Sequence, residues 1–176
     1  MAAREGIKHV IVLMLENRSF DCMLGKLYPS GPGFNGLTGN ESNPLGAGLP
    51  PIPIQPSARM DAHAVTISKP DPGEKFAEMN EQLFGPGADR SAGQPPMTGF
   101  VVNYLKRAEG VVPSPFDMMH YFKPDQLPVI SKLAKAFGVS DQWYASAPCQ
   151  TWPNRFFAHT GTCLGRVNNT DFACSP

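Results

Sequence analysis

An apolar run near the N-terminus constrains the fold of this chain more than any other feature of its sequence. Residues 7–15 read IKHVIVLML, so both faces of an extended chain would be apolar there, and β-branched residues are frequent. A short run of this kind is typical of a strand that is buried on both faces in a parallel sheet. Glu16, Asn17 and Arg18 follow immediately. The sequence therefore predicts a buried strand that ends in a cluster of polar side chains.

The rest of the chain alternates between helix and strand patterns. Apolar spacing, capping residues and terminal glycines predict helices over residues 19–27, 73–85, 98–110 and 123–138. A further helix is predicted to begin near Trp152 or Pro153, and a second, short strand is predicted over residues 138–144. Strands that alternate with helices in this way predict an α/β protein.

Residues 29–73 follow neither pattern. Pro and Gly recur there too often for regular structure, as in PSGPGFNG and LGAGLPPIPIQP. The whole chain of 176 residues contains 19 Pro and 17 Gly with an ordinary apolar content, which indicates a globular protein with long loops. A loop of this length usually has a function or crosses over a site. We therefore expect residues 29–73 to form a long excursion within a single domain.

The charge balance argues against a nucleic-acid partner. Lys plus Arg and Asp plus Glu both number 15, so the formal net charge is zero, whereas nucleic-acid binders usually carry a basic excess. No stretch approaches the roughly 18 apolar residues of a membrane span. The apolar run at residues 7–15 leads into Glu16 rather than into a cleavage site, so no signal peptide is visible and the localisation stays undetermined.

The four cysteines indicate no metal site by their spacing. Cys22, Cys149, Cys163 and Cys174 form no CxxC pair, which argues against zinc. We expect buried or free thiols, although a disulfide stays possible for an exported protein.

Thr151 has two interpretations. Pro153 suits an early position in a helix, because its missing N–H group is not needed there, and this places Thr151 at or just before the helix N-terminus. The partial positive charge of that end favours loss of a hydroxyl proton and binding of a phosphate. On spacing alone, an ordinary N-cap is the favoured interpretation of Thr151.

Glu16 and Asn17 also have two interpretations. Sites in parallel sheets form beyond the carboxyl ends of the strands, and Glu16 stands at such an end. A carboxylate beside an amide oxygen suits a divalent cation, and the Asn17 amide could instead donate to a phosphate. Alternatively, Glu16 and Arg18 are solvated loop charges.

Taken together, several stretches resemble one known family. HVIVLMLENRSFD, GLTGNESNP, PDPGEKFAEMNEQLFG, MTGFVVNY and LPVISKLAKAFGVSDQWYASAPCQTWPNRFFAHTGT occur in this order over almost the whole chain. They are similar to the bacterial and plant phosphoesterase family of non-haemolytic phospholipases C and acid phosphatases, within the alkaline-phosphatase-like superfamily. The resemblance implies an α/β/α sandwich with a mostly parallel sheet and the activity of a metal-dependent phosphoesterase. Members of this family are often exported.

The resemblance also implies roles for individual residues. Glu16, Asn17 and Thr151 would bind a divalent metal ion of undetermined identity, and Thr151 would be the nucleophile that forms a phosphothreonine intermediate. Asn17, Asn154 and Arg155 would contact the substrate, a phospholipid or a small phosphate ester. A salt bridge that holds the helix is the alternative for Arg155.

Other polar residues are given smaller roles. We expect His159 to be a packed histidine of the second helical turn, and Asp141 to be structural or to support the site indirectly. His63 and His120 belong to no recognisable constellation. Glu74 stands where members of the resembled family often have a histidine.

The chain departs from the resembled family in its length. Family members run to several hundred residues, and their second half supplies further acidic metal ligands and phosphate-binding histidines. Residues 1–176 are therefore expected to form the N-terminal part of a single phosphoesterase domain with an incomplete sheet. A truncated, catalytically incompetent fragment that acts as a binding or assembly module is the alternative. In either case, self-association or a partner chain would have to cover the uncompleted sheet.

Overall fold

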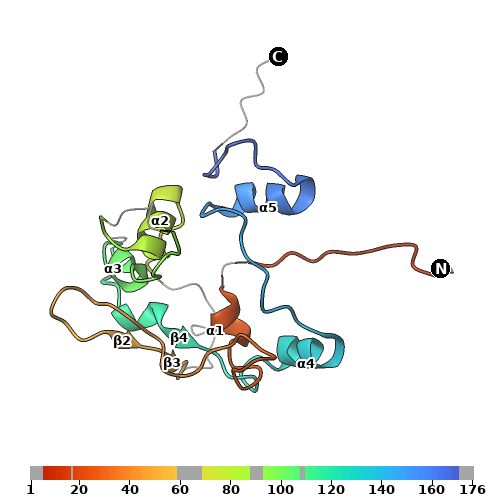
Figure 1. Ribbon diagram of the computed structural model, residues 1–176, viewed down its shortest axis with the longest axis horizontal. Helices are drawn as coiled ribbons and strands as arrows, with labels where there is room; N and C mark the ends of the chain where they lie inside the picture. Colours follow the sequence, from red (N-terminus) through yellow and green to blue (C-terminus); the bar gives the residue numbers. More distant parts are fainter. Residues whose placement is uncertain (1–5, 17, 59–68, 88–92, 108–109, 171–176) are drawn as a thin grey trace, which may run out of the picture.

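The computed structural model describes residues 6–16, 18–58, 69–87, 93–107 and 110–170 (Figure 1). Helices predominate among these residues, and the strands are short. The helices are α1 (Phe20–Leu24), α2 (Phe76–Phe84), α3 (Phe100–Tyr104), the 3-10 helix η1 (Pro115–Met118), α4 (Pro128–Phe137) and α5 (Thr151–Thr160). The strands are β1 (Ser42–Asn43), β2 (Ile52–Pro53), β3 (Gln55–Pro56) and β4 (His120–Tyr121).

The strands form two separate pairs. β1 pairs with β2 in antiparallel register, with Ser42 opposite Pro53. β3 pairs with β4 in parallel register, with Gln55 opposite His120. Each strand contains only two residues, and the first three lie within the Pro- and Gly-rich segment. The fold therefore mixes helices with few short strands, and no large parallel sheet is found among the described residues.

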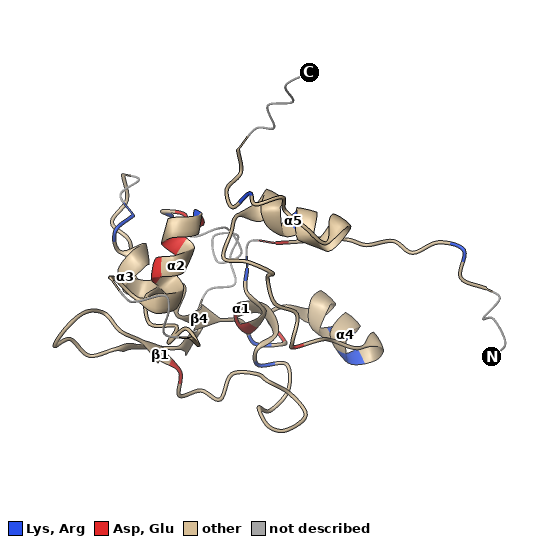
Figure 2. Cartoon of the chain, turned by 45° about the horizontal axis from the view of Figure 1, so that its top comes forward, with Lys and Arg blue, Asp and Glu red and all other residues tan. Residues whose placement is uncertain are grey.

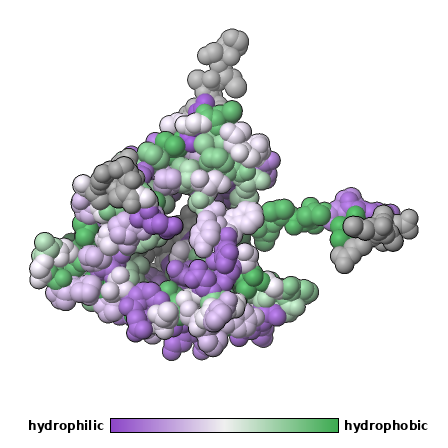
Figure 3. Space-filling model, viewed as in Figure 1, coloured by the Kyte–Doolittle hydropathy of each residue, from purple (hydrophilic) through white to green (hydrophobic). Residues whose placement is uncertain are grey.

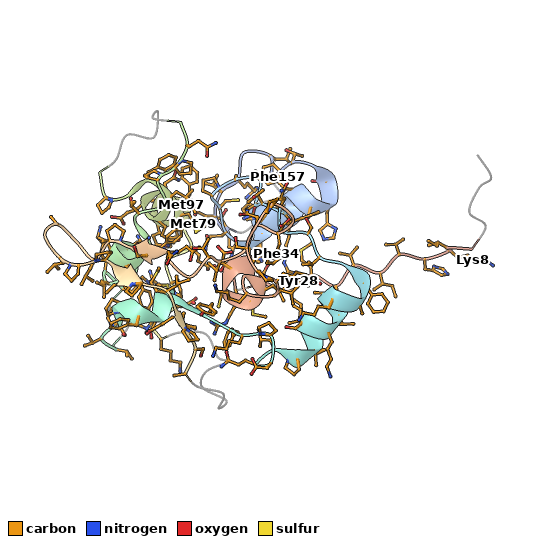
Figure 4. The ribbon with its side chains drawn as sticks, turned by 60° about the horizontal axis from the view of Figure 1, so that its bottom comes forward. Lys8, Tyr28, Phe34, Met79, Met97 and Phe157 are labelled. Carbon is orange, nitrogen blue, oxygen red and sulfur yellow. The ribbon has the colours of Figure 1, made fainter. Side chains whose placement is uncertain are left out.

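The prediction of a buried strand over residues 7–15 is wrong for this chain. The segment is extended but projects away from the body as an arm (Figure 1), and Lys8 lies near its far end (Figure 4). Val10 is 82% exposed, Ile11 92% and Val12 72%. A strand needs neighbours that accept and donate its backbone hydrogen bonds, and no described segment lies alongside the arm to do so. The described residues supply no partner strand for this apolar run, so it stays exposed.

The second predicted strand, over residues 138–144, is wrong for the same reason. These residues are irregular, Trp143 is 81% exposed and Tyr144 is 70% exposed. The predicted α/β/α sandwich lacks both of its expected strands here.

The helices follow the local signals more closely. The Ser19 hydroxyl accepts from the Cys22 N–H at 3.1 Å and caps α1, as predicted. Gly85 ends α2 and Gly138 ends α4, also as predicted. α4 begins only at Pro128, because Pro favours the first turn of a helix. The prediction for α3 was too long: the helix ends at Tyr104 rather than near residue 110.

One part of the core lies between α2, α3 and η1. Val101 is fully buried, Tyr104 is 1% exposed, and the Tyr104 hydroxyl donates to the Pro70 carbonyl at 3.0 Å. α2 and α3 approach so closely at Gly99 that a Cβ atom there would lie 1.8 Å from the Glu81 carbonyl oxygen. Only glycine fits this crossing.

Polar groups tie α2 to α3 at the same place. Gln82 donates to the Asn103 amide oxygen at 3.0 Å, and Asn103 donates to the Glu81 carboxylate at 2.7 Å. Glu81 also pairs with Lys106, and Figure 2 marks the acidic positions of α2 in red. These bonds satisfy the buried amides that the packing of the two helices encloses.

A second apolar cluster joins α1 to α4. Leu27, Phe34 and Ala134 are buried together, with Phe20 and Leu24 packed against them. Tyr28 meets the Phe34 ring edge-on at 5.3 Å between centroids, and the two lie together in Figure 4. The described cysteines, Cys22, Cys149 and Cys163, are free thiols, in agreement with the favoured prediction.

Candidate functional site

α5 begins at Thr151, as the position of Pro153 in the sequence predicted. Gln150 is the N-cap residue, with an extended backbone, and Pro153 is buried in the first turn. Thr151 is half-buried, and its hydroxyl forms no hydrogen bond with any residue in the described part of the chain. An uncommitted hydroxyl therefore stands at the positive end of a 10-residue helix.

The Gln150 side chain links the start of α5 to two other segments. Its Nε2 donates to the Glu74 carboxylate at 3.1 Å, and its Oε1 accepts from the Asn169 N–H at 2.8 Å. The Asn169 side chain in turn accepts from the Trp152 N–H at 2.9 Å. Asn169 thus satisfies one of the unpaired N–H groups that every helix N-terminus carries. Glu74, the residue that departs from the resembled family, is thus bonded to the residue that precedes Thr151.

Asn168 extends this network to α2. Its side-chain oxygen accepts from the Phe76 N–H at 3.0 Å, at the first residue of α2. The loop after α5 therefore holds the N-termini of two helices in place by side-chain capping.

Glu16 reaches the same helix from the base of the N-terminal arm. Its carboxylate accepts from Arg155 Nε at 3.1 Å, and both side chains are about a third exposed (33% and 41%). Arg155 lies one helical turn beyond Thr151. The salt-bridge alternative for Arg155 is thus what the structure contains, and its partner is the predicted metal ligand.

Asn154 is turned toward the loop before α5. Its amide nitrogen donates to the Cys149 carbonyl at 2.7 Å and, more weakly, to the Gln150 carbonyl at 3.4 Å. Its side-chain oxygen is buried and has no hydrogen-bond partner. A buried oxygen without a donor is costly, and it suits a ligand that brings a positive charge or an N–H or O–H group.

Oxygen atoms at the start of α5 suit a hard cation, but they are few. The Glu16 carboxylate, the Thr151 hydroxyl and the Asn154 amide oxygen are the types of ligand that Ca²⁺ and Mg²⁺ prefer. Asn17, the second predicted ligand, lies outside the described residues. Within the described ranges, no group of three or more His, Cys, Asp or Glu side chains could hold a metal ion. Whether Glu16, Asn17 and Thr151 converge on one ion stays a prediction.

Sequence reasoning missed a cluster formed by Arg18 and His120, which are 102 positions apart. Arg18 Nη1 lies 3.5 Å from His120 Nε2 and 3.8 Å from the Cys22 sulfur, and its guanidinium stands 5.5 Å from the centre of the Phe122 ring. Burial and the Arg18 charge lower the pKa of His120, which favours the neutral ring. Only the tertiary fold brings β4 against α1, so no local signal could have indicated this contact.

His159 and Asp141 were also given roles from the sequence. His159 was expected to be packed, but it is exposed in the last turn of α5, so that prediction is wrong. Asp141 accepts from the Asn35 N–H at 2.6 Å and has the predicted structural role. It also lines a surface pocket of about 380 Å³ with Tyr28 and Phe137, at the C-terminal end of α4. His63 lies outside the described residues.

The comparisons with known proteins define the class to which this chain belongs. The model of the phosphoesterase family matches residues 7–174. The chain therefore belongs to the phosphoesterase family, as the sequence motifs had suggested.

Its relatives include plant and bacterial phospholipases C. Non-specific phospholipase C1 of Arabidopsis thaliana is 40% identical over 163 residues, which cover 93% of this chain and 29% of that protein. Non-specific phospholipase C6 of the same plant is 37% identical, with the same coverage of both chains. Non-hemolytic phospholipase C of Burkholderia pseudomallei is 27% identical over 88% of this chain and 20% of its own length. The chain is thus homologous to phospholipase C hydrolases.

The matched region is a partial domain. The chain spans less than a third of the length of these curated relatives. Among the described residues, no helix combines the length and the apolar character needed to cross a membrane.

Proposed function

We propose that this chain contributes the nucleophile-bearing part of a metal-dependent phosphoesterase of the phospholipase C or acid phosphatase type. The observation that carries the proposal is the uncommitted Thr151 hydroxyl at the start of α5, with Glu16 held one turn away by Arg155. The 40% identity to a protein named non-specific phospholipase C1 supports the reaction class. The proposed substrate is a phospholipid or a small phosphate ester.

In this proposal, Thr151 carries the phosphoryl group between two steps. Its Oγ1 bonds to phosphorus while the ester P–O bond breaks, and its proton ends on the departing ester oxygen. Water then bonds to phosphorus, the bond from Oγ1 to phosphorus breaks, and the Thr151 hydroxyl is restored. The helix N-terminus favours the negative charge that builds up on oxygen in both steps.

The residues beside Thr151 orient the reactants. Glu16, Asn17 and Thr151 would hold the divalent ion, which, when bound, would supply positive charge to the phosphoryl oxygens. Arg155 keeps the Glu16 carboxylate at the helix, and together with Asn17 and Asn154 it would contact the phosphate. The buried, unpaired Asn154 oxygen supports a polar ligand at this place.

The proposal extends to the fold of the complete domain. Residues 1–176 would form the N-terminal part of an α/β/α sandwich with a mostly parallel sheet. The exposed apolar run at residues 7–15 and the exposed Trp143 and Tyr144 support this fold, since β-branched and aromatic residues are typical of strands. A partner chain or self-association would cover them.

A second candidate function is a catalytically incompetent binding or assembly module. The observation that favours it is the scarcity of acidic ligands, because the described residues contain no group of three that could hold a metal. A hard divalent ion usually takes about six oxygens, so an ion held by Glu16, Asn17 and Thr151 alone would bind weakly.

One assay separates the two candidates. The purified chain would be tested on a chromogenic phosphate ester and on phospholipid vesicles, with and without added divalent metal ions. We expect metal-dependent turnover well below about 10 per second, the median for enzymes. Thr151→Ala should abolish this turnover, and Thr151→Ser should retain part of it because a hydroxyl remains.

Thr160 offers a matched control, since it is a threonine at the other end of the same helix. Thr160→Ala should keep the turnover of the unmodified chain. If turnover is absent at every metal concentration, or survives in Thr151→Ala, the phosphoesterase proposal fails for this chain and the binding-module alternative gains support.

A further inference from the structure

The outer face of α4 carries an apolar stripe, formed by Val129, Leu133 and Phe137. These residues are four positions apart, so they line one face of the helix. Their exposed fractions are 72%, 53% and 88%, and hydrophobic atoms come to the surface around α4 in Figure 3. The opposite face of α4 packs into the apolar cluster with α1 through Ala134. The α4 stripe is therefore an apolar face beyond the one that packing in the body requires, and such faces usually mark interaction sites.

The surface pocket at the C-terminal end of α4 adjoins the stripe, because Phe137 belongs to both. Tyr28 and Phe34 also line the pocket, and their rings lie together in Figure 4. Lys135 and Asp141 complete the set of residues that carry its chemistry. The Lys135 ammonium lies 5.7 Å from the centre of the Tyr28 ring, so this ring already accepts a cation. The pocket thus combines aromatic rings with one group of each charge.

The two charged groups of the pocket do not pair with each other. Neither Lys135 nor Asp141 forms an ion pair within the part of the chain that the structure describes. Oδ2 of Asp141 accepts from the Asn35 N–H at 2.6 Å, and its Oδ1 accepts from no described residue. Opposite charges that stay apart in one pocket are complementary to a ligand that carries both charges. The aromatic rings suit an ammonium as the cationic group of that ligand.

We propose that the C-terminal end of α4 docks on a surface of zwitterionic phospholipid. The Lys135 ammonium would bind the headgroup phosphate, while Asp141 and the Tyr28 ring would bind the headgroup ammonium. The stripe would enter the boundary between headgroups and acyl chains, where the apolar faces of interfacial helices lie. The inference goes beyond the proposed reaction, because it concerns adsorption to a surface, and it does not depend on the role of Thr151.

Other occupants fit this end of α4 less well. A stable interface between proteins takes about 20–30 residues on each side, whereas the stripe consists of three side chains. A small zwitterion in solution would fill the pocket but leave the stripe in water. A phospholipid surface covers the stripe and fills the pocket at the same time.

Co-sedimentation with phosphatidylcholine vesicles tests the proposal. The chain used carries Thr151→Ala, so hydrolysis cannot change the vesicles and failure of the proposed chemistry cannot affect the result. We expect this chain to bind and Phe137→Ala to weaken binding about 10-fold or more, because a Phe side chain loses its burial in lipid. Phe116→Ala is the matched control: Phe116 is 46% exposed but lies in η1, and its substitution should change binding less than twofold.

A substitution of Asp141 tests the recognition of the headgroup. Asp141→Asn keeps an oxygen that can accept from the Asn35 N–H but removes the negative charge. We expect this change to weaken binding to phosphatidylcholine vesicles about threefold or more, as loss of an exposed ion pair would. Binding to phosphatidylglycerol vesicles should not weaken, because that headgroup has no ammonium. Circular dichroism of both variants should match that of the parent chain, since Phe137 is exposed and the bond to Asn35 is kept.

Four results would overturn the proposal. The first is the absence of vesicle binding, or equal binding by Phe137→Ala. The second is an equal effect of Asp141→Asn on both lipids, which would mean that the pocket does not hold the headgroup. Self-association without vesicles that Phe137→Ala abolishes would assign the stripe to a second copy of the chain. Soluble phosphocholine that binds as tightly as the vesicles would assign the pocket to a small ligand.

Discussion

Replacing Gln82 with Met tests the account of how α2 and α3 are held together. Gln82 is 8% exposed, and its amide nitrogen donates to the Gly73 carbonyl at 2.6 Å and to the Asn103 amide oxygen at 3.0 Å. Met has a similar length and volume but donates no hydrogen bond. The substitution should therefore leave two buried acceptors without a donor while hardly changing the packing.

The expected loss follows from those two acceptors. Leaving a buried polar group unsatisfied costs about 1–3 kcal/mol. Asn103 keeps its own donation to Glu81, so its side chain stays in place, and Met recovers part of the loss through apolar contact. We expect the free energy of unfolding to fall by about 2–4 kcal/mol.

Urea unfolding followed by circular dichroism measures this loss. The slope of the free energy against urea should stay the same, because a change in stability alone shifts only the midpoint. Gln142→Met is the control, since Gln142 is exposed and should change stability by less than about 0.5 kcal/mol. A Gln82→Met chain as stable as this control would refute the claim that the amide network holds the two helices.

The remaining predictions concern the close approach of α2 and α3 at Gly99, the capping of α5 by Asn169 and the titration of Glu41. Gly99→Ala should destabilise the chain by about 3 kcal/mol or more in thermal unfolding, because the added Cβ would overlap the Glu81 carbonyl. Gly33→Ala is the control and should leave the stability unchanged, because a Cβ there would have no atom within 4 Å. Asn169→Ala should lower the free energy of unfolding by about 0.5–2 kcal/mol, because the Trp152 N–H loses its acceptor. Amide hydrogen exchange in the first turn of α5 should become faster, and unchanged exchange would contradict the cap. Burial raises the pKa of Glu41, but donation from the Thr38 and Gly39 N–H groups and the Thr38 hydroxyl outweighs it and lowers the pKa to about 2. Because the folded pKa lies below the ordinary value of 4.5, ionised Glu41 should make the chain more stable than Glu41→Gln above pH 4.5. This advantage, about 1 kcal/mol after solvent screening, should be lost as the pH falls toward 2. A constant difference between the two chains across this pH range would contradict the prediction.

The helices could be predicted from the sequence because their ends are set by near neighbours. Ser19 caps α1 through a residue three positions away, and Gly85 and Gly138 end their helices through their own backbone geometry. Pro153 likewise indicated the start of α5. Each of these signals acts within one helical turn, so tertiary structure is not needed to interpret it.

Strand pairing and most of the site could not be predicted in this way. A strand forms only when a second segment supplies its hydrogen-bond partners, and the apolar composition of residues 7–15 says nothing about whether that segment is present. β4 was missed because its pairing with β3 spans distant parts of the chain. The contacts of Glu74 with Gln150 and of Arg18 with His120 were missed for the same reason. The sequence indicated candidate site residues, but the fold decided which of them meet.

The pairing of Glu16 with Arg155 connects the N-terminal arm to the candidate site. An ion pair with this degree of exposure contributes at most about 1 kcal/mol, so it anchors the base of the arm only loosely. Guanidinium groups bind phosphate as readily as carboxylate, so Arg155 can exchange the Glu16 carboxylate for an anionic ligand at little cost.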